Sequence, residues 1–118
     1  MGSMVRAECL CGFERGVRIG GGMLNSGGRC GFPCLCGGCH DLVEVNLLAK
    51  RMKCPDCGSG EVVPYDDPSL AGSPGKEEVA GWNMRGKGGR KLSLTDGNYK
   101  CPRCGRMALR FEAYGFFD

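Results

Sequence analysis

Alternating apolar and polar residues mark several short segments that are typical of half-buried β-strands. The clearest lies near the C-terminus, where every second residue is apolar: Met107, Leu109, Phe111 and Ala113. Residues 42–47 alternate in the same way, although the apolar residues from 42 to 52 also fit one face of a helix. Shorter strand-like runs occupy residues 61–65, 91–95 and 98–100. Between the last two, Asp96-Gly97 predicts a two-residue hairpin turn. This pattern favours a small all-β fold.

The chain has few apolar residues from which to build a core. Ten of its 118 residues are cysteines, and without them about a third of the chain remains for ordinary apolar packing. The 22 glycines and the scarcity of β-branched residues disfavour both a leucine-rich helical bundle and a parallel sheet. Small domains with such a core are held together by disulfides or by metal ions.

The predicted compartment decides between these two crosslinks. No basic segment followed by an apolar run stands at the start of the chain, and nowhere does an apolar stretch reach the roughly 18 residues of a membrane span. We therefore expect a soluble, cytoplasmic protein that is not bound to a membrane. In a reducing cytosol, closely paired cysteines act as metal ligands far more often than as a disulfide framework.

Eight of the ten cysteines form four close pairs: Cys9/Cys11, Cys36/Cys39, Cys54/Cys57 and Cys101/Cys104. The last two pairs share the sequence C-P-x-C-G, which suits a tight turn, or knuckle, that points two sulfur atoms at one ion. Proline fixes φ at the second position, and glycine after the second cysteine accepts the positive φ that such a turn leaves. Cys9/Cys11 is one residue shorter than the usual knuckle.

The two central pairs have the spacing of a single metal site. Fourteen residues separate Cys39 from Cys54, enough for a β-hairpin that brings both pairs to one tetrahedral ion. Residues 36–57 therefore resemble the zinc ribbon family. The outer pairs are left for a second site, which gives an inner ribbon (32–65) nested in an outer one (5–24 plus 91–118). Residues 66–90 are then a mobile connector, and 5–118 form one compact unit with two structural Zn²⁺ ions.

A sequential pairing is the alternative, with Cys9/Cys11 joined to Cys36/Cys39 and Cys54/Cys57 joined to Cys101/Cys104. In that arrangement the second half is similar to rubredoxin, because C-x-x-C-G is followed by Tyr65-Asp66-Asp67-Pro68 and then by C-P-x-C-G. The interval from Cys57 to Cys101 is longer than a rubredoxin needs. This resemblance implies bound iron and electron transfer instead of zinc.

The remaining candidate residues give little support for catalysis. Cys30 and Cys34 are expected to be free thiols, and His40, the only histidine, is expected in solvent or beside a metal site rather than as a ligand. Residues 81–88 match G-x-x-x-x-G-K but lack the following Ser or Thr and the flanking strand and helix of a nucleotide-binding loop. Four thiolates also leave a zinc ion without an open position for substrate. We therefore expect a non-enzyme with no small-molecule substrate.

One short segment favours a binding function for nucleic acid or for a protein partner. It combines four basic residues with a nearby aromatic side chain: Arg85, Lys87, Arg90, Lys91 and Trp82. Such a segment can follow a phosphate backbone while the aromatic ring stacks on a base. An ordinary solvated loop is the alternative. Two four-cysteinate zinc sites change the formal net charge from +3 to −1, so only this local segment supports nucleic-acid binding.

Overall fold

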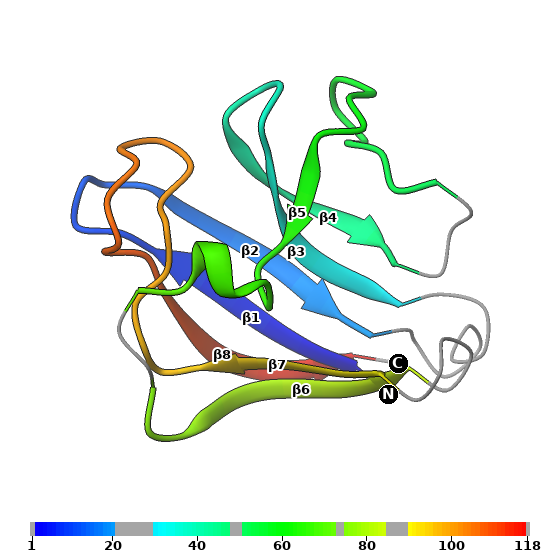
Figure 1. Ribbon diagram of the computed structural model, residues 1–118. Coiled ribbons are helices and arrows are strands. Elements are labelled where there is room, and N and C mark those ends of the chain that lie inside the picture. The colour runs from blue at the N-terminus through cyan, green and yellow to red at the C-terminus, as the bar shows by residue number, and fades with distance from the viewer. Residues whose placement is uncertain (1, 21–29, 48–50, 73–74, 85–89, 118) are drawn as a thin grey trace.

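The computed structural model describes residues 2–20, 30–47, 51–72, 75–84 and 90–117, without the side chains of 2, 82–84, 90–91 and 116–117 (Figure 1). These residues form eight strands and one short 3₁₀ helix: β1 (Gly2–Glu8), β2 (Glu14–Ile19), β3 (Gly31–Cys36), β4 (Asp41–Asn46), β5 (Val62–Pro64), η2 (Pro68–Leu70), β6 (Glu78–Met84), β7 (Arg90–Thr95) and β8 (Arg110–Phe117). The strands make three small antiparallel sheets, β2-β1-β8, β4-β3-β5 and β6-β7. The predicted small all-β fold is confirmed.

The sheet β2-β1-β8 joins the two ends of the chain. Its middle strand β1 pairs with β2 on one side and with β8 on the other, so that Val5 lies opposite Val17 and also opposite Ala113. The predicted C-terminal strand is present but begins later, at Arg110, because Leu109 pairs with Tyr99 in a separate β-bridge. Met107, predicted to be buried, is 42% exposed as a result.

The sheet β4-β3-β5 contains the central part of the chain. Residues 42–47 lie in or next to β4, so the strand prediction is confirmed and the helical alternative is wrong. Val43 and Val45 are both buried, and they pair with Cys34 and Phe32 of the neighbouring strand β3. Burial of the strand follows from its position against a second sheet, since β2 contacts both β3 and β4.

The third sheet corrects the predicted hairpin. Residues 91–95 do not pair with 98–100; strand β7 pairs instead with β6, which lies within the segment 66–90 predicted as a connector. The carboxylate of Asp96 accepts hydrogen bonds from the backbone N–H groups of Lys76 and Glu77, and the Asp96 N–H donates to the Glu77 carbonyl. Asp96 is thus bound to the chain before β6 and does not form a local turn.

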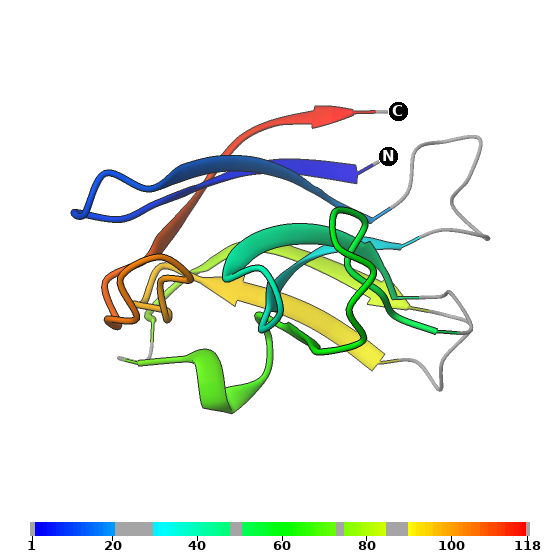
Figure 2. The same cartoon turned by 90° about the horizontal axis from the view of Figure 1, so that it is seen from above.

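The three sheets pack around a shared core that centres on the sheet β2-β1-β8. Strand β2 contacts β3 and β4 of the second sheet, and β6 contacts β1 and β8 (Figures 1 and 2). Tyr65, Tyr99 and Phe111 meet edge to face, with ring centroids 5.1–6.1 Å apart. These aromatic rings join the end of β5 to the segment that leads into β8, so the central and terminal parts of the chain share one core.

Candidate metal centres

The structure collects eight cysteines into two groups of four sulfur atoms. The outer cluster consists of Cys9, Cys11, Cys101 and Cys104, and the inner cluster of Cys36, Cys39, Cys54 and Cys57. Within each cluster all four sulfur atoms lie within 4.8 Å of one another. In Figure 1 the loop after β1 faces the orange loop before β8, and the loop after β3 faces the green loop before β5. This is the nested pairing; the sequential pairing is not found.

The distances between the sulfur atoms fit metal coordination and exclude disulfides. The pairs Cys9–Cys104 and Cys11–Cys101 are each 3.7 Å apart, and in the inner cluster Cys36–Cys57 is 3.6 Å and Cys39–Cys54 is 3.7 Å. Four sulfur atoms placed tetrahedrally at about 2.3 Å from an ion lie about 3.8 Å from one another. A disulfide requires about 2.05 Å. Both clusters therefore have the dimensions of a four-thiolate metal site.

The two C-P-x-C-G segments fold as the sequence predicts, and they fold alike. In each, the N–H of the final glycine donates to the carbonyl of the first cysteine at 2.9 Å. Gly58 and Gly105 have φ values of +75° and +74°, a backbone conformation that other residues rarely adopt. The sulfur of each first cysteine also accepts a backbone N–H, from Cys57 in the inner cluster and from Cys104 in the outer one.

The other two knuckles make a similar turn with different sequences. After Cys11 the chain turns through Gly12 at φ +100°, and after Cys39 it turns through His40 at φ +51°. All four cysteine pairs are therefore followed directly by a residue with positive φ. His40 is exposed, as expected, but its role in this turn was not predicted, since glycine is the usual residue at such a position.

Backbone hydrogen bonds make one thiol in each cluster more acidic than its neighbours. The N–H of Cys39 lowers the pKa of the Cys36 thiol to about 7, and the N–H of Arg106 lowers the pKa of Cys104 to about 7. A hydrogen bond with the Cys36 sulfur raises the pKa of Cys39 to about 12, and burial raises the pKa of Cys9 to about 12. An ion that binds all four sulfurs must displace these protons, so metal affinity decreases as the pH decreases.

Arg15 connects the outer part of the molecule to the inner cluster, which sequence reasoning missed. Its guanidinium forms a 2.8 Å ion pair with Asp41, which follows the first inner knuckle. It also lies 3.8 Å from the carboxylate of Asp56, between the two cysteines of the second inner knuckle. No local pattern marks this arginine, because its partners are 26 and 41 positions away in the chain.

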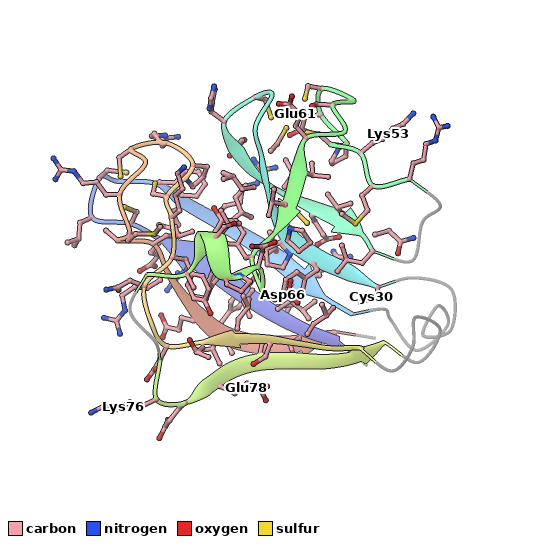
Figure 3. All side chains as sticks on the ribbon, viewed as in Figure 1. Cys30, Lys53, Glu61, Asp66, Lys76 and Glu78 are labelled. Atoms are coloured by element: carbon pink, nitrogen blue, oxygen red, sulfur yellow. The ribbon has the colours of Figure 1, made fainter. Side chains whose placement is uncertain are left out.

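The remaining two cysteines lie outside both clusters. Cys30 and Cys34 are both buried, and neither forms a disulfide. The Cys34 thiol donates to the Phe32 carbonyl at 3.6 Å. Cys30 directly precedes β3, at the opposite end of that strand from Cys36 (Figure 3).

The basic segment predicted to bind nucleic acid lies partly outside the described residues. Arg85 and Lys87 lie outside the described residues. Trp82 lies near the end of β6, and Arg90 and Lys91 are the first two residues of β7. Of these three residues the structure describes the backbone alone. It places them on neighbouring strands, with Trp82 opposite Leu92 and Lys91 opposite Asn83.

No protein-family model, no curated protein and no solved structure matches this chain. Within the ranges that the structure describes, no helix has both the length and the apolar character needed to cross a membrane.

Proposed function

We propose that the protein is a zinc-binding module in which two nested, ribbon-like sites each hold one Zn²⁺ ion with four cysteinates. The observation that carries this proposal is the pair of four-sulfur clusters, with sulfur-to-sulfur distances of 3.6–3.7 Å. Zn²⁺ takes four thiolate ligands in tetrahedral geometry at structural sites. Native mass spectrometry of the full chain tests it, with two bound zinc ions expected; an apo protein with full native structure would refute it.

The grouping of the cysteines removes the sequence resemblance from which the iron alternative came, while four thiolates suit either metal. The likeness to rubredoxin required Cys54 and Cys57 to share an ion with Cys101 and Cys104, and these pairs lie in different clusters. Visible absorption distinguishes the two metals, because iron in four thiolates is coloured and d¹⁰ zinc is not. We expect a colourless protein that contains two equivalents of zinc by elemental analysis. A red protein with stoichiometric iron would replace this proposal by electron transfer.

We assign both ions a structural role and the protein a non-catalytic one. Four protein thiolates leave no open coordination position for a substrate or an activated water. Each cluster also joins two segments that are distant in the chain. Cys9 and Cys104 lie 95 positions apart in the chain, so a shared ion closes almost its full length.

We also propose that the protein binds nucleic acid. This proposal is based on the basic segment. The residues to change together are Arg85, Lys87, Arg90 and Lys91. We expect single-stranded or duplex oligonucleotides to bind at low salt and to dissociate as salt increases, because phosphate contacts release counterions. Replacing the four residues by alanine should abolish this binding. Replacing four exposed basic residues elsewhere is the matched control: Arg51, Lys53, Lys76 and Lys100.

Three outcomes of this experiment are possible. Loss of binding only in the variant of the basic segment supports a nucleic-acid interface. Equal loss in both variants would show a nonspecific effect of charge. If no oligonucleotide binds at low salt, nucleic acid is excluded as the partner and a protein partner takes its place in the proposal.

A further inference from the structure

The outer cluster encloses the inner cluster along the chain. All four inner cysteines, from Cys36 to Cys57, lie in the segment between Cys11 and Cys101 of the outer cluster. In the folded protein the sulfur atoms of Cys11 and Cys101 are 3.7 Å apart, although an unfolded chain of this length rarely brings its ends together. An ion that orders the inner segment therefore reduces the entropy that is lost when the outer cluster forms.

Arg15 is one contact between the two parts of the molecule. It lies on β2, four residues after the outer Cys11. Its guanidinium is 2.8 Å from Asp41, which follows the first inner knuckle, and 3.8 Å from Asp56, which lies within the second. Each of these three side chains is at least 32% exposed, so water weakens both ion pairs. Arg15 thus makes a small contribution that requires both inner knuckles to be in place.

Tyr65 is a second contact, and it is fully buried. Its backbone N–H donates to the Pro33 carbonyl of the inner sheet at 3.0 Å, and its hydroxyl donates to the Lys100 carbonyl at 2.8 Å. Lys100 directly precedes Cys101 of the outer cluster, and its N–H donates to the Leu70 carbonyl at 2.8 Å. In Figure 1 the chain after β5 accordingly runs through η2 to the segment that leads into this outer knuckle.

Cysteines from both clusters also belong to one buried core. Cys36 and Cys54 of the inner cluster and Cys101 of the outer cluster are each at most 2% exposed, and they lie in the same apolar cluster. The edge-to-face rings of Tyr65 and Tyr99 are part of this core. An ion that orders one knuckle therefore orders part of the core on which the other knuckle packs.

We propose that the two zinc sites are positively coupled, so that an ion in either cluster raises the affinity of the other cluster for zinc. This rests on the two-zinc function proposed above. The first ion orders the shared contacts, and the second ion then binds a chain that is already partly ordered. Because coupling is reciprocal, both sites gain by the same factor. Tyr65 is the main positioning residue between them, and Arg15 adds a smaller share. The folded two-zinc protein therefore forms over a narrow range of free zinc concentration.

The test is native mass spectrometry of the zinc-loaded full chain, equilibrated with a chelator that buffers free zinc and a phosphine that keeps the thiols reduced. Two independent sites, whether equal or unequal, leave at least half of the molecules with one ion when half of all sites are filled. A coupling factor of about ten or more leaves at most about a quarter of the molecules with one ion. A one-zinc fraction below one half supports the coupling, and a fraction of one half or more overturns it.

This outcome is distinct from failure of the two-zinc proposal itself. The same measurement at saturating zinc counts the bound ions, so a chain that binds fewer than two ions refutes the earlier proposal. A chain that binds two ions through a dominant one-zinc species refutes the coupling alone.

Tyr65→Phe tests the main contact, because it removes the hydroxyl and keeps the ring. Loss of one ordinary hydrogen bond should lower the coupling factor about fivefold and so raise the one-zinc fraction at half saturation. Tyr114→Phe, at a tyrosine that is 58% exposed, is the matched control and should leave this fraction unchanged. Equal one-zinc fractions in the two variants would overturn the role of Tyr65.

A chain without an outer site separates coupling from a general effect on stability. Cys101→Ser combined with Cys104→Ser disables the outer cluster, and competition with a chelator then gives the zinc affinity of the inner cluster alone. In this background Tyr65→Phe should change that affinity by less than about twofold, because the Lys100 contact is not ordered by an outer ion. A fivefold loss in this background would show that Tyr65 stabilises the inner site without coupling it to the outer one.

Discussion

The hydroxyl of Tyr65 donates a 2.8 Å hydrogen bond to the carbonyl oxygen of Lys100. Tyr65 directly follows β5 of the sheet that carries the inner cluster, and Lys100 directly precedes Cys101 of the outer cluster. The Tyr65 side chain is fully buried, and its ring packs edge to face on Tyr99 and Phe111. One side chain therefore fixes the position of an outer knuckle relative to the inner sheet.

Tyr65→Phe should destabilise the zinc-loaded protein by about 1–3 kcal/mol, because it leaves the Lys100 carbonyl without its donor while keeping the aromatic packing. Burial also raises the pKa of Tyr65 well above its usual range, so the hydroxyl remains a donor at every accessible pH. Urea unfolding with excess zinc measures the change. Tyr114→Phe, at a tyrosine that is 58% exposed, serves as the control and should stay within about 0.5 kcal/mol of wild type. Equal stability of the two variants would show that the hydrogen bond contributes nothing.

Removal of zinc should unfold most of the protein. The binding energy of a structural zinc site is largely folding energy, and here the two clusters join segments 15 to 95 positions apart. We expect a chelator to abolish the dispersion of the amide NMR spectrum and to change the far-ultraviolet circular dichroism, with recovery when zinc is added back. An unchanged spectrum after complete metal removal would count against a structural role for both ions.

Gly38→Ala should destabilise the protein by about 1–3 kcal/mol, since the new methyl group would lie 2.9 Å from the Ser59 side chain. The combination of Gly38→Ala with Ser59→Gly should recover part of this loss. Gly60→Ala is the matched control in the facing loop, directly after Ser59, because a Cβ there meets nothing within 4 Å. Thermal unfolding of the three variants with zinc provides the comparison. If Gly38→Ala and Gly60→Ala unfold at the same temperature, the close packing of the inner knuckles is not significant.

The sequence was most informative where chemistry fixes local geometry. The C-P-x-C-G motif predicted two knuckles, and the structure forms both with nearly equal φ values at Gly58 and Gly105. The spacing of the inner cysteines also favoured the nested pairing. Each of these features depends on residues within one turn, or on an interval that one hairpin can span.

The features that the sequence did not predict all depend on distant partners. Asp96-Gly97 has the local signature of a hairpin turn, yet the Asp96 carboxylate binds N–H groups twenty positions earlier. Leu109 leaves the predicted strand because it pairs with Tyr99. Arg15 reaches the inner cluster across two sheets. Such contacts compete with local preference through tertiary packing, which alternation and turn signals do not record.

The Asp96 interaction makes a prediction about pH dependence. Backbone hydrogen bonds from Glu77 and Lys76 hold the pKa of the Asp96 carboxyl below its usual range. A carboxyl with a lowered pKa in the folded state stabilises the protein fully above its unfolded pKa of about 3.9, and loses this effect only as pH falls through the lower folded value. We expect Asp96→Ala to lower the melting temperature by the same amount at every pH from 8 to 5, and Asp96→Asn, which keeps an acceptor oxygen, to lower it less.

Melting curves of the zinc-loaded wild type and both variants across this pH range provide the measurement, and they avoid the acidic conditions that release zinc. Glu112→Ala, at a side chain that is 69% exposed and lies outside the β6-β7 sheet, controls for the general effect of removing one negative charge. A difference between wild type and Asp96→Ala that already shrinks between pH 7 and pH 5 would mean that Asp96 takes up a proton too early to accept these backbone bonds. In that case the start of β6 must be fixed by another contact.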